Sequence, residues 1–63
     1  MTCYRFIFNI KMGEEIKEPK TSVNIVAKNY DYAKKELDNW AISQKIEIVN
    51  LKCTDDFFVW VYN

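Results

Sequence analysis

The chain has 63 residues, 49% of them hydrophobic and 16% aromatic, and nine basic residues balance nine acidic ones. This length fits a single domain over residues 1–63, and the composition is that of a folded domain rather than a disordered one. Arg5 is the only arginine and the net charge is zero. Both features disfavour a dedicated nucleic-acid binder, because such proteins usually carry a basic excess.

Residue types that build most catalytic and metal sites are absent or isolated. The chain has no histidine, one glycine and two cysteines at opposite ends. It therefore lacks a histidine general base and a glycine-rich phosphate loop, and its cysteines make a poor zinc set. The acidic pairs at residues 14–15 and 55–56 fall in expected turns, where solvated acids are ordinary. We expect a protein that is not an enzyme and that uses no cofactor and no metal.

The two cysteines, Cys3 and Cys53, are expected to be free thiols in a cytoplasmic protein. No basic leader followed by an apolar segment is visible, and no apolar run approaches the roughly 20 residues that span a membrane. A disulfide between Cys3 and Cys53 is the alternative.

Residues 2–12 alternate with a period of two, which predicts a half-buried strand. The face expected to pack on a helix carries Tyr4, Phe6, Phe8, Ile10 and Met12. The opposite face carries Cys3, Arg5, Ile7, Asn9 and Lys11.

An exposed connection is predicted at residues 13–20, because Gly13 permits positive φ and Pro19 excludes a central strand. Ile16 within it either pins the loop to the body or forms an exposed contact. Residues 21–28 alternate again and predict a second strand, antiparallel to the first. Its more polar side carries Ser22, Asn24, Val26 and Lys28.

A helix is predicted from Asn29 to about Gln44. Asn29 is a good N-cap because its side-chain oxygen can accept a backbone N–H of the first turn. Mainly apolar residues recur at spacings of three and four, which indicates one buried stripe. This stripe consists of Tyr30, Ala33, Leu37, Trp40, Ala41 and Gln44.

Two further strands are predicted after the helix. Residues 46–54 alternate imperfectly. A bulge near Val49 or Asn50 would bring their apolar residues to one face, and the alternative is that both faces are partly covered. Residues 54–56 predict a tight turn. The final stretch, residues 56–63, is apolar on both faces, which is typical of a strand inside a sheet.

These elements predict an α+β fold of the ββαββ type, with a four-stranded sheet and one helix on one face. The economical strand order is 2-1-4-3, with the first and last strands parallel at the centre. This element order resembles that of the small β-grasp domains of the immunoglobulin-binding bacterial type, and it implies no function. The order separates the two cysteines by about 10 Å, which is too far for a disulfide.

One helix covers one face of such a sheet, and the other face is left open to a partner. The candidate partner-binding residues are Arg5, Ile7, Phe58, Trp60, Tyr62, Glu14 and Glu15. We expect a small non-catalytic protein-binding module that occupies a larger protein target. In size, lack of motifs and composition the chain resembles small phage and mobile-element proteins, including anti-CRISPR and other inhibitors of host defence proteins.

Surface acids would mimic phosphates on such a target if they cluster in space; the candidates are Glu14, Glu15, Glu18, Asp55 and Asp56. One alternative is a single-stranded nucleic-acid-binding domain. In that case the bases of the bound strand would stack on Tyr4, Trp60 or Tyr62, and its phosphates would contact Arg5, Lys11 and Lys28. The other alternative is a structural homo-oligomer, such as a homodimer, whose open faces pack together. A membrane partner is not expected.

Overall fold

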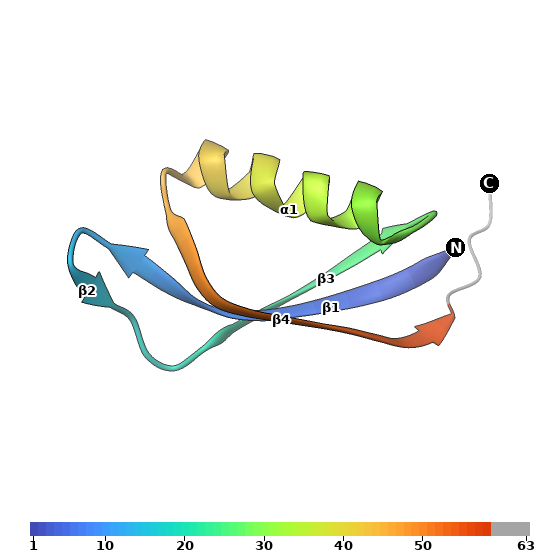
Figure 1. The fold of residues 1–63 in the computed structure, drawn as a ribbon, viewed down its shortest axis with the longest axis horizontal. Helices are drawn as coiled ribbons and strands as arrows, with labels where there is room; N and C mark the ends of the chain where they lie inside the picture. The colour runs from blue at the N-terminus through green and yellow to red at the C-terminus, as the bar shows by residue number, and fades with distance from the viewer. Residues whose placement is uncertain (59–63) are drawn as a thin grey trace.

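A computed structural model describes residues 1–58, and it describes side chains as far as Thr54. The elements in chain order are β1 (Thr2–Met12), β2 (Glu15–Ile16), β3 (Thr21–Ala27), the helix α1 (Tyr30–Gln44) and β4 (Glu47–Phe58). The helix lies over one face of the sheet and leaves the other face without a helix (Figure 1).

The first strand is the centre of the sheet. Arg5 of β1 pairs with Asn24 of β3 and also with Thr54 of β4, so β3 and β4 lie on opposite sides of β1. The two-residue β2 pairs with Lys11 and Met12 at the far end of β1. All three pairings are antiparallel.

Four strands and one helix in a mixed α+β fold confirm the coarse prediction, but the order 2-1-4-3 is not the one that the structure has. The first and last strands are antiparallel, not parallel. The two strands expected after the helix are one strand, β4. The likeness to β-grasp domains therefore does not extend beyond the shared mixture of a sheet and one helix.

Residues 54–56, where a turn was expected, belong instead to β4, which continues through them with a bulge. Thr54 pairs with Arg5, and Phe57 pairs with Cys3. Three steps along β4 thus match two steps along β1, so one extra residue is accommodated without ending the strand. Two adjacent acids indicate a turn by composition, but here the strand continues through them to Phe58.

The bulge predicted near Val49 or Asn50 is confirmed. Lys52 pairs with Ile7 and Val49 pairs with Asn9, so β4 again has one residue more than β1. The extra residue is accommodated at Asn50, whose φ is 57°. The bulge brings the residues on its two sides to the helix-covered face, where Ile48, Leu51 and Cys53 pack against the core.

The helix begins and ends close to the predicted residues. The side chain of Asn29 accepts a hydrogen bond from the Tyr32 backbone N–H, and Lys45 ends the helix in the left-handed region at φ 57°. Ala33, Leu37 and Ala41 are buried against the sheet, whereas Gln44 of the predicted stripe is exposed.

The aromatic face of β1 supplies most of the core, as predicted. Phe6, Phe8 and Leu37 are fully buried, and removing each such side chain from water stabilises the fold by roughly 1.5–3 kcal/mol. Met12, at the end of this face, is 54% exposed because the helix does not reach it.

Both cysteines are free thiols, as predicted, but the physical reason differs from the expected one. Cys3 and Cys53 lie on adjacent strands, β1 and β4, not on strands separated by a third. Cys53 pairs with Phe6, three residues along β1 from Cys3. Because Cys3 and Phe6 are an odd number of steps apart along β1, the two thiols lie on opposite faces of the sheet.

Candidate protein-binding face

The helix-free side of the sheet, hereafter the open face, is formed by alternate residues of three strands. The unbroken register between β1 and β3 fixes which residues share this side. The described residues of the open face are Cys3, Arg5, Ile7, Asn9, Lys11, Ser22, Asn24, Val26, Glu47, Val49, Lys52 and Thr54. The prediction that the odd-numbered residues of β1 lie opposite the helix is confirmed.

The middle of the open face combines one apolar side chain with basic and polar neighbours. Ile7 is half-buried and lies between Ser22 of β3 and Lys52 of β4. One register step away, Arg5 Nε donates a hydrogen bond to Asn24 Oδ1 at 3.3 Å, which holds the guanidinium against the sheet. Arg5 and Ile7, two of the predicted partner-binding residues, therefore lie together.

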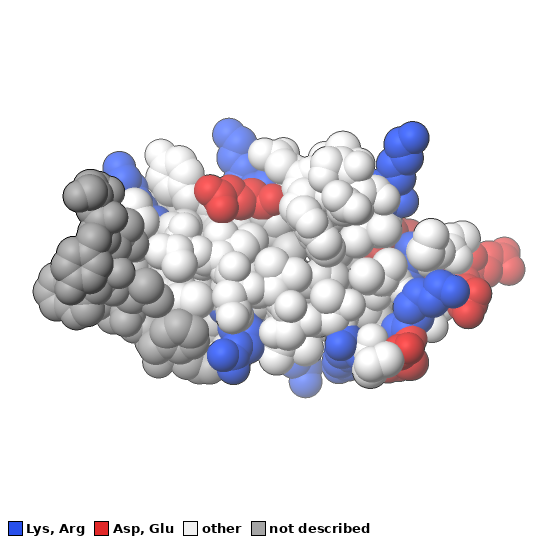
Figure 2. Space-filling view, turned by 180° about the vertical axis from the view of Figure 1, so that it is seen from behind, with Lys and Arg blue, Asp and Glu red and all other residues white. Residues whose placement is uncertain are grey.

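Charged side chains are spread over the molecule. Lys and Arg side chains extend from the helix side and from the lower, helix-free side, and Asp and Glu side chains lie at the end formed by the β1–β2 turn and also near the helix (Figure 2). Lys11 Nζ lies 4.0 Å from Glu47 Oε2, so that pair is close to neutral. Arg5 and Lys52 are the other two basic residues among the described side chains of this face.

One end of the open face is closed by the loop after β2. Asn9 is only 1% exposed, although its neighbours on this face are not buried to that degree. Its amide nitrogen donates to the Lys17 carbonyl at 3.1 Å and to Glu18 Oε1 at 3.0 Å. Residues 17–18 therefore cover this end of the sheet. Further along the face Ile7 and Arg5 are partly buried, and Cys3 beyond them is 4% exposed.

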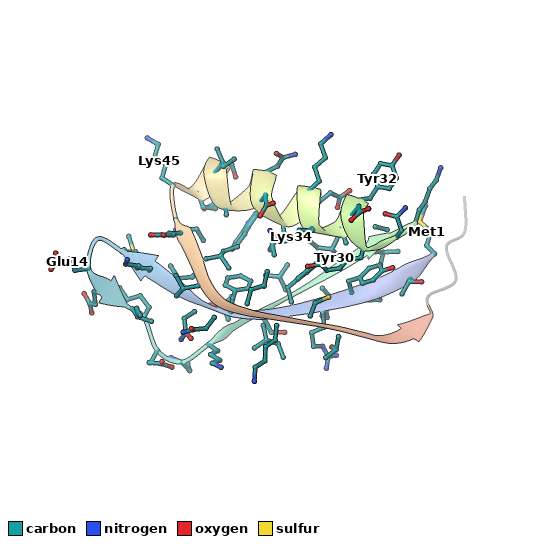
Figure 3. All side chains as sticks on the ribbon, in the orientation of Figure 1. Met1, Glu14, Tyr30, Tyr32, Lys34 and Lys45 are labelled. Atoms are coloured by element: carbon teal, nitrogen blue, oxygen red, sulfur yellow. The ribbon has the colours of Figure 1, made fainter. Side chains whose placement is uncertain are left out.

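The predicted acidic residues do not join this face. Glu14 lies in the β1–β2 turn, and Glu15 pairs with Lys17 at 3.3 Å. At about 3.3 Å per residue, the seven residues from Arg5 to Met12 place this turn roughly 23 Å from Arg5. In Figure 3 Glu14 projects from the end of the molecule opposite to Met1.

The other acids expected to join a phosphate-mimicking cluster lie elsewhere. The backbone of residues 55 and 56 lies between the positions that pair with Arg5 and Cys3, near the opposite end of β1 from Glu14. These residues therefore do not form one cluster with Glu14 and Glu15, and the geometry does not support a single phosphate-mimicking surface.

The remaining predicted site residues belong to the C-terminal stretch. Phe58 is the last residue of β4, and its backbone pairs with Thr2. Trp60 and Tyr62 lie outside the described residues.

The aromatic side chains described on β1 are not available to bases. Tyr4 is 9% exposed and packs edge-on against Tyr30 of the helix, with ring centroids 6.2 Å apart. Phe8 packs against Trp40 at 6.1 Å. The expectation that Tyr4 stacks on a nucleobase is therefore wrong, because the side chain is part of the core.

A shallow hollow of about 230 Å³, which was not predicted from the sequence, lies near the N-terminus between the end of β3 and the first turns of α1. Its lining is Met1, Val26, Ala27, Lys28, Tyr32 and Glu36. Met1 and Tyr32 project at this end of the molecule in Figure 3. The only signal for it in the sequence is Tyr32, an aromatic residue outside the buried stripe of the helix.

Among the described side chains, no group of three or more potential metal ligands comes together. Within residues 1–58, no helix is both long and apolar enough to cross a membrane. Comparisons of the chain with family models, with curated proteins and with solved structures found no match.

Proposed function

We propose that this protein is a non-catalytic binding module that docks its open face on an acidic patch of a larger protein. The observation that carries the proposal is the placement of Ile7, half-buried and without a covering helix, next to Lys52 on the neighbouring strand and two residues from Arg5 on its own strand. An apolar centre with charged groups around it is the composition of a protein-binding surface, and arginine is enriched where binding energy concentrates.

The basic side chains of the open face indicate which kind of partner surface it would bind. Arg5 and Lys52 belong to adjacent strands and point to the same side, whereas Glu47, the acid described on this face, lies near Lys11. A complementary partner surface is therefore acidic. Such pairing speeds association and selects the correct partner more than it adds affinity.

A protein suits this surface better than a single nucleic-acid strand does. Proteins that hold single strands on a sheet combine basic groups with exposed aromatic rings. On the open face, the described side chains of β1 and β3 include no aromatic residue, because Tyr4, Phe6 and Phe8 face the helix. Acting by occupying a target's surface would make the protein a stoichiometric inhibitor or adaptor.

The test is a capture experiment with matched charge reversals. Immobilised wild-type protein is compared with the double variant Arg5→Glu/Lys52→Glu and with the control Lys35→Glu/Lys45→Glu. The control changes the net charge equally, but its residues are exposed on the helix and at its end. We expect one acidic protein to be retained by wild type and control, to be lost with the open-face variant, and to elute as salt rises.

Two results would contradict the proposal. Retention that is equal for both variants would place the binding surface elsewhere. Retention of nuclease-sensitive material in place of a protein would favour the nucleic-acid alternative. Circular dichroism of each variant establishes that a lost interaction does not reflect a lost fold.

A further inference from the structure

The edge of β3 that faces away from β1 is suited to pairing with a strand of another chain. Residues Thr21–Ala27 pair with β1 in an unbroken register of seven residue pairs, without a bulge. The segment contains no charged residue and no proline, and Thr21, Val23, Ile25 and Val26 are β-branched. Soluble proteins usually protect an edge strand with a charge, a proline or a bulge, and β3 has none of these.

The opposite edge of the sheet is protected. Strand β4 carries two register shifts, and its exposed side chains include Glu47 and Lys52. Bulges twist an edge away from a regular partner, and charges oppose pairing with a second sheet. Pairing in the described part of the sheet is therefore favoured at β3 over β4.

We propose that two copies of this chain pair through their β3 strands, antiparallel about a twofold axis at Asn24. This register joins all seven residues of each strand, because Asn24 is the middle residue of Thr21–Ala27. It places Ser22 opposite Val26 of the second copy, and Val23 opposite Ile25. Each pair joins residues of the same face, as the alternation of a sheet requires.

Side-chain exposure supports a second copy as the occupant of this edge. Val23 and Ile25 pack against the core but remain only partly buried, so the hydrophobic layer is incomplete at β3. A second copy would continue that layer with the same two residues. An interface whose residues oppose each other reciprocally is the form that a twofold dimer takes.

The helix contributes to the same edge. Tyr32 is 58% exposed and lines the hollow beside Val26, so it lies on the flank of α1 next to β3. The twofold axis would place both helices on one side of a continuous sheet and bring these flanks together. Tyr32 would then lose solvent exposure, and both open faces would lie on the other side.

The test measures solution mass for variants with charges at the axis. Asn24→Lys and Asn24→Glu each place two like charges directly opposite each other, which opposes pairing. Wild-type protein is expected to have twice the 7.6 kDa chain mass in sedimentation equilibrium. Each single variant is expected to raise the dimer dissociation constant at least about tenfold, equivalent to about 1.4 kcal/mol. An equimolar mixture of the two variants is expected to restore the dimer.

The control substitutions are Gln44→Lys and Gln44→Glu, at an exposed position near the end of the helix. They should leave the mass unchanged. If the Asn24 variants do not fold, mixing Val26→Lys with Ser22→Glu tests the same register, because these positions face each other across the axis.

A wild-type protein that stays monomeric up to about 1 mM, where even weak dimers form, would overturn the inference. A dimer that persists in Asn24→Lys would overturn it as well, and loss of the dimer only in Arg5→Glu/Lys52→Glu would assign association to the open face. Partner capture is expected to rest on Arg5, Ile7 and Lys52, none of which belongs to β3. Wild-type protein that forms the dimer but captures no acidic partner, or that captures one as a monomer, would therefore separate the two proposals.

Discussion

Asn50 Nδ2 donates a hydrogen bond to Asn9 Oδ1 at 3.1 Å, although 41 residues separate the two in the chain. The amide nitrogen of Asn9 donates in turn to the Lys17 carbonyl and to Glu18. One buried amide thus joins the bulge of β4, the centre of β1 and the loop that closes one end of the open face. A buried polar group whose hydrogen bonds are all made specifies one arrangement of its neighbours.

Replacing Asn9 by alanine is expected to lower the free energy of unfolding by about 2–3 kcal/mol, because the partners of its amide lose their hydrogen bonds where water is excluded. Urea unfolding followed by circular dichroism measures this value. Asn39→Ala, at an exposed position of the helix, serves as the control and should change it by less than about 0.5 kcal/mol. An Asn9→Ala protein as stable as wild type would show that the amide does not hold the loop.

Asn50 has a φ of 57°, a left-handed conformation that glycine adopts freely and other residues adopt at a cost. Asn50→Gly keeps the backbone conformation and loses the hydrogen bond to Asn9. Asn50→Val loses both, and its branched side chain makes this φ especially unfavourable. We expect the valine variant to unfold at a lower urea concentration than the glycine variant, by about 1–2 kcal/mol. The reverse order of the two midpoints would contradict the bulge at Asn50.

Gly13 allows a test of backbone conformation alone. Its φ is 65°, and a Cβ added there would meet no atom within 4 Å. Gly13→Ala should therefore destabilise the protein through backbone strain alone, by about 1–2 kcal/mol in thermal or urea unfolding. D-alanine at this position, introduced by chemical synthesis, favours positive φ and should restore or exceed wild-type stability. Equal losses with both alanines would mean that contacts, not φ, determine the cost.

The N-cap of the helix is expected to contribute about 1 kcal/mol. The Asn29 side chain accepts the Tyr32 backbone N–H at 3.1 Å, and alanine has no acceptor to replace it. Asn29→Asp keeps an acceptor oxygen and adds a negative charge where the helix dipole favours one. Thermal unfolding should therefore rank Asn29→Asp at or above wild type and Asn29→Ala below both. An alanine variant with unchanged stability would contradict a role for this cap.

Leu37 is the helix residue on which the core should depend most. It is fully buried, whereas Ile42 on the same helix is 73% exposed. Leu37→Ala should cost about 3 kcal/mol or more because it leaves a cavity among the β1 aromatics. Ile42→Ala should cost less than about 0.5 kcal/mol. Unfolding midpoints that fall equally for the two variants would mean that the helix does not pack on the sheet through Leu37.

Local signals in the sequence predict the helix and the central strand closely. Asn29 and the stripe around Leu37 define a helix through a cap and a period, both of which depend on nearby residues. The strict alternation of residues 2–12 predicts β1 and its two faces. The broken alternation around Asn50 predicts a bulge, because a bulge is what reconciles two parities on one face.

Strand order could not be predicted in the same way, because it depends on contacts between distant residues. The acids at 55 and 56 indicate a turn by composition, yet β4 continues through them with a bulge opposite β1. With one strand in place of two, β1 becomes the central strand. The burial of Asn9 depends on the loop at Lys17 and Glu18, so no pattern within β1 could indicate it.

Only part of the candidate site could be predicted, because the rest depends on which strands pair. Arg5 and Ile7 share a face because they lie two residues apart on one strand, which alternation alone determines. Lys52 joins them only through the pairing of β4 with β1, which the predicted order did not contain.

Cross-saturation NMR of the labelled protein bound to its captured partner tests the central claim most directly, because it reports which amides lie at the interface. We expect the largest signal losses at Arg5, Ile7 and Lys52 on the open face, and little loss at Lys35 on the exposed side of the helix. The largest losses along α1, with Arg5 and Ile7 unaffected, would contradict the assignment of the open face as the binding surface.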